Sequence, residues 1–568
     1  MPQLTKARPP IIFILVFVVV LAATYALALP GYFLFDDIGN LEGLAQVADL
    51  RSWLTFVTAG EAGPLGRPVS LASFALQSGT WPDDTASLLQ VNIGIHVLNT
   101  FLVFLLAMGL ASIRKPSETA NPLWIGLLTA MLWAASPFLA NSSLLIIQRM
   151  ATLAGFFMFA GLTAFVWAHH ESVRAPPVRW SLLALFAACI PLAAFSKENG
   201  ALLPVLAALI YLVWIPRQNR HPGIAERGFY LVFVAIPAAA VLLYIASRVP
   251  EIISSGYGPR RHFTPEERLL SQPLILWDYV RNLLIPRAAS AAPFTDHWPG
   301  ATGFLSPPGA GIALFAWIAV IGAAVALWNK ARWLIFGIGF FLGAHLVESS
   351  VFGLELYFAH RNYVPAFGIY FGLVWALFSL PQEHLKKAIT GASAYALISL
   401  LVLVQTTASW NDTFPNALAW QQEHPYSERA AQFLAQQYLN LGSPHGARKA
   451  MDDLAARSPW LARTQIMRTQ FCVGEEDGFP QLVDEVVGKL KNSRLDEYAA
   501  VELVNATHDE GQRSAYCGLR DMQVIARMAE ALLENHAYRD HALTRSALAY
   551  VMASAREAPV EAGKALAP

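Results

Sequence analysis

Long runs of apolar residues, separated by short polar turns, occupy the first 408 positions of the chain. Each run is close to the about 20 residues that an α-helix needs to cross the hydrocarbon core of a bilayer. The first run follows Lys6 and Arg8, and we interpret it as a signal anchor that stays in the membrane. The pattern predicts eleven transmembrane helices, at residues 11–29, 88–110, 122–138, 145–168, 180–196, 199–216, 229–247, 309–327, 332–353, 363–380 and 388–407.

The pattern changes after Trp410, where polar, helix-favouring residues replace the apolar runs. Ala, Leu, Gln, Glu and Arg recur at helical spacing, with breaks at 442–444, 458–459 and 478–480. Residues 409–568 are therefore predicted to form a soluble all-helical domain. Residues 427–459 alternate small and large side chains like a tetratricopeptide-repeat hairpin. A degenerate solenoid with a concave surface for a protein partner and a plain helical bundle fit this domain equally well.

Lysine and arginine are concentrated in alternate turns, and such turns stay preferentially on the cytoplasmic side. The intervening short turns keep only Lys197 and Arg361. Segments 31–87 and 249–308 and everything after about residue 408 are therefore predicted to be external. We expect a multi-pass protein of a bacterial inner membrane, with its external face and tail in the periplasm; an organelle lumen is the alternative. The cationic turns hold Lys6, Arg8, Arg114, Lys115, Arg174, Arg179, Arg217, Arg220, Arg227, Lys330, Arg332, Lys386 and Lys387.

Composition agrees with an all-α protein surrounded by membrane lipids. Hydrophobic residues make up 55% of the chain, charged residues 14%, and the mean hydropathy is +0.42, which is too apolar for a soluble enzyme. The formal net charge is zero, so there is no polybasic face for nucleic acid. Cys189 lies within a predicted span, whereas Cys472 and Cys517 fall in the exported tail. A disulfide between those two and a pair of buried thiols are equally open.

Ionisable side chains in or beside membrane helices are costly and tend to mark a functional site. In this sequence they come from distant segments, yet the predicted orientation places them all at the external boundary. A single water-filled cavity there would accommodate them. They are Asp36, Asp37, Arg67, Arg149, Lys197, Glu198, His345, Glu348, Glu355, His360 and Arg361.

These residue types suit transfer from a phosphate-linked donor. Arginine or lysine can hold a lipid phosphate, and a carboxylate can take the proton of an acceptor hydroxyl. Asp36 and Asp37 could divide the work, one as the base and the other orienting a cation, a sugar hydroxyl or a divalent metal ion. Alone, the same pair would suit a helix N-cap, and Lys197 with Glu198 would suit a snorkelling surface pair. Arg149 needs an anionic partner or water.

Other polar residues have simpler interpretations. His96 is interpreted as a core histidine that bonds to a neighbouring helix. Asp278 and Arg281 lie three residues apart on an amphipathic stretch, which predicts a local ion pair. Asp296 and His297, in the long external segment, are expected to be solvated.

Several short motifs follow one another in a set order along residues 10–405. They are Phe35-Asp36-Asp37, Arg67-Pro68-Val69-Ser70, Asn92-Ile93-Gly94-Ile95-His96-Val97-Leu98-Asn99, Ser136-Pro137-Phe138, Gln148-Arg149-Met150, Ser196-Lys197-Glu198-Asn199, Ser271-Gln272-Pro273 and His360-Arg361-Asn362-Tyr363-Val364-Pro365. Their order and outward placement resemble the transmembrane and tetratricopeptide-repeat O-mannosyltransferase family and its bacterial relatives, within the GT-C glycosyltransferase superfamily.

The resemblance implies a GT-C-like catalytic domain over residues 1–408 and a periplasmic repeat-like domain over 409–568. It also implies a polyprenyl-phosphate sugar donor and an inverting transfer on the far side of the membrane. The stretch at 360–362 looks closer to the bacterial members, so mannose is not implied. The roles carried over are the catalytic base for Asp36 or Asp37, donor-phosphate binding for Arg149, Lys197, Arg361 and Arg67, and support for Glu198, His360, Glu348 and His345.

The acceptor implied first is a periplasmic protein, such as a pilin-like substrate gathered by the helical tail. Transfer to a glycolipid or an envelope polysaccharide uses the same chemistry. A transporter or flippase of a lipid-linked sugar is an alternative of another class, but its path should place ionisable residues at several depths. A scaffold acting through the tail would leave the external charge cluster without a role.

Overall fold

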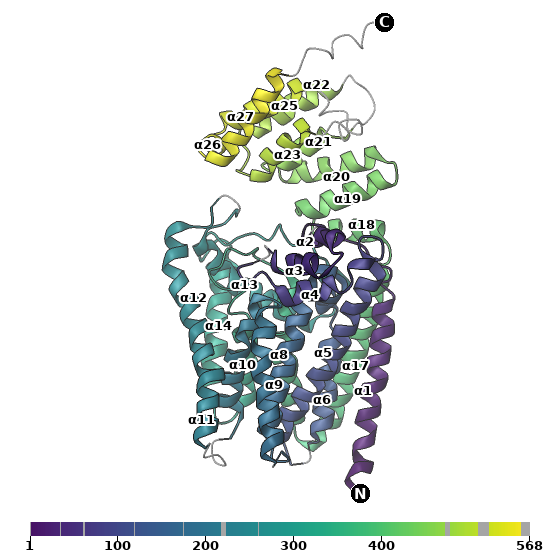
Figure 1. Ribbon diagram of the computed structural model, residues 1–568, viewed down its shortest axis with the longest axis vertical. Coiled ribbons are helices and arrows are strands. Elements are labelled where there is room, and N and C mark those ends of the chain that lie inside the picture. The colour runs from purple at the N-terminus through teal and green to yellow at the C-terminus, as the bar shows by residue number, and fades with distance from the viewer. Residues whose placement is uncertain are drawn as a thin grey trace. The chain divides into compact units, whose positions relative to one another are not determined.

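The computed structural model describes residues 2–34, 36–60, 63–118, 120–173, 175–216, 223–258, 261–471, 478–508 and 522–557. Within these ranges all the regular elements are helices and there is no strand, as predicted (Figure 1). The chain divides into two compact units. The apolar unit comprises Met1–Gly256, Pro265–Pro293 and Gly300–Asn411, and the tail unit comprises Tyr257–Thr264, Phe294–Pro299 and Asp412–Pro568.

Several helices of the apolar unit are long and apolar enough to cross a membrane. A further span arises if α6 (Pro122–Ala134) and α7 (Pro137–Leu144), which are bent by 68° at their break, count as one. The described residues thus have the helices of a multi-pass membrane protein. The six long ones are α5 (Thr85–Ile113), η3 with α8 (Ile146–Ala168), α9 (Pro176–Ala194), the helix from α11 to α12 (Ile224–Ser255), α14 (Pro308–Ala326) and α17 (Gln382–Ser409).

Shorter apolar helices occupy the remaining predicted stretches. They are Ile12–Ala26 within α1 (Pro2–Ala26), Glu198–Trp214, which comprises η4, α10 and η5, α15 (Arg332–Ala344) and α16 (Ala366–Phe378). The helix predicted at 332–353 ends early, at Ala344. The chain turns there because residues 345–358 form a loop that is held by side chains from another segment, as described below.

Close backbone contact packs α15 against α16. A Cβ atom at Gly368 would lie 2.6 Å from the Gly337 carbonyl oxygen, so only glycine fits at this crossing. Membrane helices commonly use small residues in this way. In contrast, α14 exposes large apolar side chains, with Ile312 and Phe315 each 69% exposed, as expected for a surface in lipid.

Short helices in the segments between the long helices gather at one end of the apolar unit, with the start of α1 at the other end (Figure 1). Asp84 caps α5 by accepting a hydrogen bond from the Ser87 amide. The predicted Asp278–Arg281 pair is confirmed on α13, with its atoms 2.5 Å apart. The short helices are α2 (Asp36–Leu41), η1 (Glu42–Gln46), α3 (Leu50–Thr58), α4 (Pro68–Ala75), η2 (Ser78–Thr80), η7 (Ala288–Ala291) and η8 (Ala359–Asn362), and the 20-residue α13 (Pro265–Leu284) belongs to the same set of connecting segments.

In the tail unit the first helices, α18 to α20, pack on their neighbours along the chain, whereas α21 to α27 share one apolar core in which α27 packs on both α23 and α25. The hairpin predicted at 427–459 forms as α19 and α20, which turn at Gly442. Cys472 and Cys517 lie outside the described residues, and Cys189 is a buried free thiol in α9. The helices are α18 (Thr413–Glu423), α19 (Glu428–Asn440), α20 (Pro444–Arg457), α21 (Ala462–Arg468), α22 (Phe479–Leu490), α23 (Glu497–His508), α25 (Met522–Glu534), α26 (His536–Arg539) and α27 (Ala542–Glu557).

The prediction that Asp296 is solvated is wrong. Its carboxylate accepts hydrogen bonds from the Ser427 hydroxyl at 2.5 Å and from the Glu428 and Arg429 amides at 3.0 and 3.3 Å. These donors lie at the N-terminus of α19, where a carboxylate is favoured by the unpaired amides and the helix dipole. The long segment therefore contributes a helix cap to the tail unit.

Candidate functional site

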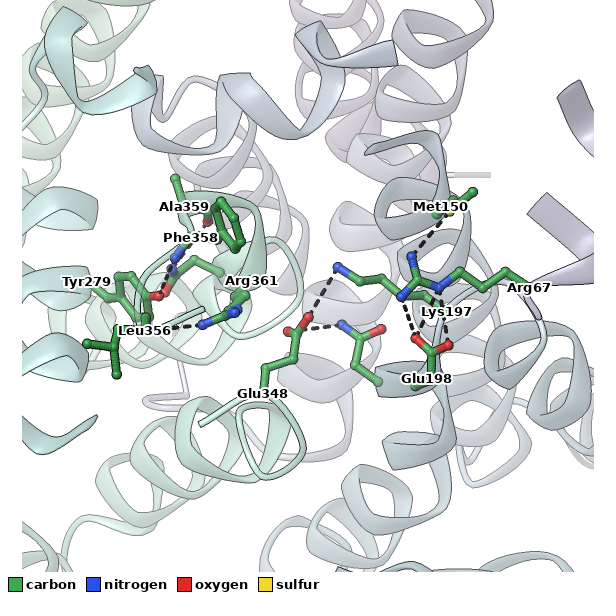
Figure 2. A network of polar contacts seen from close by, with 12 residues as sticks. Arg67, Met150, Lys197, Glu198, Tyr279, Glu348, Leu356, Phe358, Ala359 and Arg361 are labelled. Carbon is green, nitrogen blue, oxygen red and sulfur yellow. Dashed lines mark hydrogen bonds and ion pairs between the residues drawn. The ribbon is translucent and has the colours of Figure 1, made fainter. Parts of the chain in front are cut away.

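Five charged residues from four segments of the apolar unit come together, and we call Arg67, Lys197, Glu198, Glu348 and Arg361 the polar cluster. The Arg67 guanidinium donates to the Glu198 carboxylate at 2.9 to 3.2 Å. The Lys197 ammonium lies 3.1 Å from Glu348, and this pair lies between the first pair and Arg361 (Figure 2). All five were predicted at the site from the sequence.

The turn that carries Lys197 and Glu198 is fixed by close backbone contacts. A Cβ atom at Gly200 would lie 2.1 Å from the Ala193 carbonyl oxygen, so the chain can fold back onto the end of α9 only with glycine there. The Ser70 hydroxyl donates to the Ser196 carbonyl at 2.9 Å. This contact joins the start of α4 to the turn and brings Arg67 beside Glu198.

Arg67 has a backbone conformation that is unfavourable for a residue with a side chain. Its φ of 52° is left-handed, and no other described non-glycine residue has a positive φ. Such a conformation costs about 1–3 kcal/mol and persists where surrounding contacts impose it. Here Gly63 packs so closely that a Cβ atom would lie 2.2 Å from the Glu198 carboxylate. The contacts thus hold the Arg67–Glu198 pair in one geometry.

Arg361 differs from the other two cations because it has no carboxylate partner. Its guanidinium donates to the Leu356 carbonyl at 3.1 Å and stacks on the Phe358 ring at 5.2 Å. No ion pair to it occurs among the described residues, although its side chain is buried. The polar cluster contains three cations and two carboxylates and so carries one excess positive charge. An anion can compensate it.

Arg268 of α13 shapes the loop that presents Glu348. This fully buried arginine donates to the backbone carbonyls of Ser350 at 2.8 Å, Glu355 at 3.1 Å and Glu348 at 2.6 Å, and also to Leu354. The sequence gives no signal for this role, because Arg268 lies in an ordinary amphipathic pattern and its partners are main-chain atoms about 80 residues away.

The two aspartates of the first loop have different surroundings. Asp37 is buried, and its carboxylate accepts the Leu34 and Ile147 amides at 2.7 Å each. Burial raises the pKa of Asp37 to about 7, against these two hydrogen bonds, which favour the charged form. Asp36 is exposed at the start of α2. Asp37 therefore ties the loop to the main body and leaves Asp36 accessible.

A chain of contacts connects this loop to the polar cluster. Asp37 bonds to Ile147, which lies one helical turn before Met150, and the Met150 sulfur contacts the Arg67 guanidinium at 3.4 Å. Ile146, Ile147 and Met150 also share an apolar core with residues of α2, α3 and α4. The segment that carries Asp36 is thus packed onto the element next to Arg67.

Arg149 is not part of the polar cluster, and the prediction that it needs an anion or water is wrong. Its three nitrogens donate to the Asn92 side chain at 2.8 Å and to the Ser73 and Leu88 carbonyls at 3.1 and 2.8 Å. Its guanidinium also lies 4.1 Å from the centre of the Phe74 ring. Arg149 thereby joins α4, α5 and α8 through neutral groups.

The predicted histidines His345 and His360 lie near the polar cluster. His345 stacks on Tyr279 with ring centres 5.6 Å apart, and both side chains are buried. Burial and the nearby cations Lys197, Arg361 and Arg67 lower the pKa of His360 well below its usual value, so this imidazole is neutral. His96 is a core histidine, as predicted, and lies 2.9 Å from the Tyr363 hydroxyl.

In the part of the chain that the structure describes, no three His, Cys, Asp or Glu side chains are grouped as ligands. Both oxygens of Asp37 already accept backbone amides.

No protein-family model matches the sequence, and no curated protein matches it.

Proposed function

We propose that this protein is a GT-C-type glycosyltransferase of a bacterial inner membrane, which moves a sugar from a polyprenyl-phosphate donor to a periplasmic hydroxyl. The observation that supports this most is the excess positive charge of the polar cluster, which comes from its buried member Arg361, a cation without an ion pair among the described residues. A buried guanidinium of this kind is well suited to a phosphate oxygen, which it can bind through two parallel hydrogen bonds.

The arrangement of helices supports eleven spans. The six long helices, the bent pair and the four shorter apolar helices correspond one by one, and in the same order, to the eleven predicted stretches. With the cationic turns in the cytoplasm, the polar cluster and the tail unit are periplasmic.

The proposed reaction is a single displacement at the anomeric carbon. The acceptor hydroxyl oxygen attacks this carbon and loses its proton to Asp36, while the bond from carbon to the phosphate oxygen breaks. The leaving polyprenyl phosphate keeps the bonding electrons, and Arg361 stabilises its added charge. Lys197 and Arg67, each held in an ion pair, add positive charge near the phosphate. Glu198, Glu348 and His360 support these cations. Asp37 positions the loop through its two amide contacts.

The helices of the tail unit are suited to holding a protein acceptor. The α19–α20 hairpin has the form of one tetratricopeptide-like repeat, and we propose that later helices continue it as a degenerate array. A pilin-like periplasmic protein is the partner proposed first. Transfer to a glycolipid or an envelope polysaccharide would use the same catalytic residues.

The experiment compares a deletion strain with strains that carry the wild type, Asp36→Asn or Asp83→Asn. Asp83 is an exposed aspartate of the same segment and serves as the matched control. Mass spectrometry of exported proteins and envelope lipids should show a sugar that is lost in the deletion and Asp36→Asn strains and retained with Asp83→Asn. Full modification with Asp36→Asn, at equal membrane levels, would refute the assignment of the base. Unchanged proteins and lipids in the deletion strain would refute the proposed function.

A further inference from the structure

Two arginines that have no ion pair among the described residues meet at the end of the apolar unit opposite to the polar cluster. Arg114 follows the last turn of α5, and its guanidinium donates to the Trp214 carbonyl. Trp214 ends the apolar helix that begins at Glu198, so the length of that helix separates this place from the polar cluster. Arg332 is the first residue of α15. The proposed reaction gives neither arginine a role.

The packing of α15 on Trp214 brings the two arginines together. The centres of the Trp214 and Phe336 rings are 4.8 Å apart, and the Trp214 indole nitrogen donates to the Leu110 carbonyl at 2.9 Å. Arg332 lies four residues before Phe336 and therefore on the same face of α15. Trp214 thus contacts α5 on one side and the face of α15 that carries Arg332 on the other.

The charges of the two arginines are not compensated by the described residues. Burial, and next the charge of Arg332, lower the pKa of Arg114 below its ordinary value. Arg332 lies over the Trp328 ring at 5.9 Å and has no carboxylate partner in the described part of the chain. Arg179, in another cationic turn, pairs with Glu226 at 2.6 Å. Like charges held close together are unfavourable, and an anion that binds both removes this cost.

Apolar side chains near the two arginines are exposed, as expected for a surface in lipid. Leu212 lies two residues before Trp214, and Leu327 lies at the end of α14, a short turn before Arg332; both are exposed. Trp328 is of a residue type that is enriched at the boundary between hydrocarbon and water. A ligand that suits this place has an anionic group for the arginines and an apolar part for the neighbouring surface.

We propose that Arg114 and Arg332 bind the headgroup phosphate of an anionic phospholipid, whose acyl chains lie along the exposed apolar side chains. A zwitterionic headgroup would bring its own cation towards two guanidinium groups, whereas an anionic headgroup adds only the phosphate that they bind well. Basic sites between membrane helices on the cytoplasmic side are typical places for anionic headgroups. The site is separate from the polar cluster and does not depend on the proposed reaction.

The test measures lipid binding to the full-length protein by native mass spectrometry from detergent. The probes are phosphatidylglycerol and phosphatidylcholine with the same acyl chains. We expect the wild type to prefer phosphatidylglycerol. Arg332→Gln should weaken its binding about fivefold, because one arginine near a membrane surface is worth about 1 kcal/mol, whereas Arg332→Lys should retain most of it. Arg179→Gln is the matched control, since it removes the same charge from an arginine that Glu226 compensates, and it should bind like the wild type.

Measurements on the wild type do not depend on the folding of a variant. Its preference for phosphatidylglycerol should weaken as salt rises, because salt screens charges near the surface. Inorganic phosphate in excess, at constant ionic strength, should not displace the lipid. No preference for phosphatidylglycerol would overturn the site. An equal loss in Arg332→Gln and Arg179→Gln would also overturn it, because net charge alone would then act. Displacement by inorganic phosphate would overturn the assignment to a lipid and show a site for a soluble anion.

Discussion

Two regions of the apolar unit, one around Arg149 and one around Arg361, bury a guanidinium in different ways. Each nitrogen of Arg149 donates to a neutral acceptor, and together these contacts join three helices. Arg361 donates to one backbone carbonyl, contacts the Tyr279 side chain and stacks on an aromatic ring, within a cluster whose excess positive charge it supplies. The comparison shows that burial of a cation does not by itself indicate a ligand site. The partners of its donors separate an arginine that holds the fold from one that can bind an anion.

The largest effect on folding is expected from Arg149→Met. The variant removes three hydrogen bonds and leaves the Asn92, Ser73 and Leu88 oxygens unpaired, so we expect about 3–5 kcal/mol of destabilisation. Unfolding in a denaturing detergent would measure it. Transfer activity should fall only with the folded fraction. A variant with wild-type stability and no activity would show that Arg149, like Arg361, serves the reaction and not the fold, which would contradict the comparison.

Arg268→Met should have a smaller and more local effect. It removes the donors that hold the carbonyls of Glu348, Ser350 and Glu355, so hydrogen exchange in residues 345–358 should rise strongly. Arg281→Met on the same helix is the control, because the Arg281 side chain is exposed and its pair with Asp278 is worth about 0.5 kcal/mol or less. Equal exchange in the two variants would show that Arg268 does not shape the loop.

The smallest expected effect is a pH dependence of the stability of the tail unit, caused by Glu428. Burial raises the pKa of Glu428 to about 7, while its hydrogen bond from the Thr464 hydroxyl at 2.6 Å acts against this rise. The folded state therefore binds the proton more tightly than the unfolded state, whose pKa is near 4.5. Stability should fall as pH rises from about 4.5 to 7 and then level off.

Hydrogen exchange of α19 and α21, corrected for intrinsic rates, should show faster opening at pH 8 than at pH 5. Glu428→Gln keeps an acceptor for Thr464 but does not ionise, so it should remove most of this dependence. A variant that retains the wild-type pH dependence would show that another group causes it.

Much of the fold could be predicted from the sequence, because apolar length and polar breaks are local signals. Every predicted apolar stretch contains an apolar helix, and the α19–α20 hairpin forms where small and large residues alternate. The early end of α15 could not be predicted, and the loop that follows it is held by Arg268 from a distant segment. The cap that Asp296 provides to α19 depends likewise on contacts far apart in the sequence.

The members of the polar cluster could also be predicted, because ionisable residues near apolar helices are rare and easily recognised. Their partners could not be. Nothing local distinguishes Arg149, which bonds to backbone carbonyls, from Arg361, which lacks a carboxylate. The different surroundings of Asp36 and Asp37 likewise appear only when the Ile147 amide is placed beside the loop.

Binding of polyprenyl phosphate to the wild type, Arg361→Gln and Arg149→Lys tests the central claim most directly. All three proteins would be measured folded in nanodiscs, at the same ionic strength. The account predicts that Arg361→Gln weakens binding about 100-fold, the loss of one charge-assisted bidentate contact of about 3 kcal/mol, while Arg149→Lys binds like the wild type wherever it is folded. Wild-type affinity in Arg361→Gln would contradict the account.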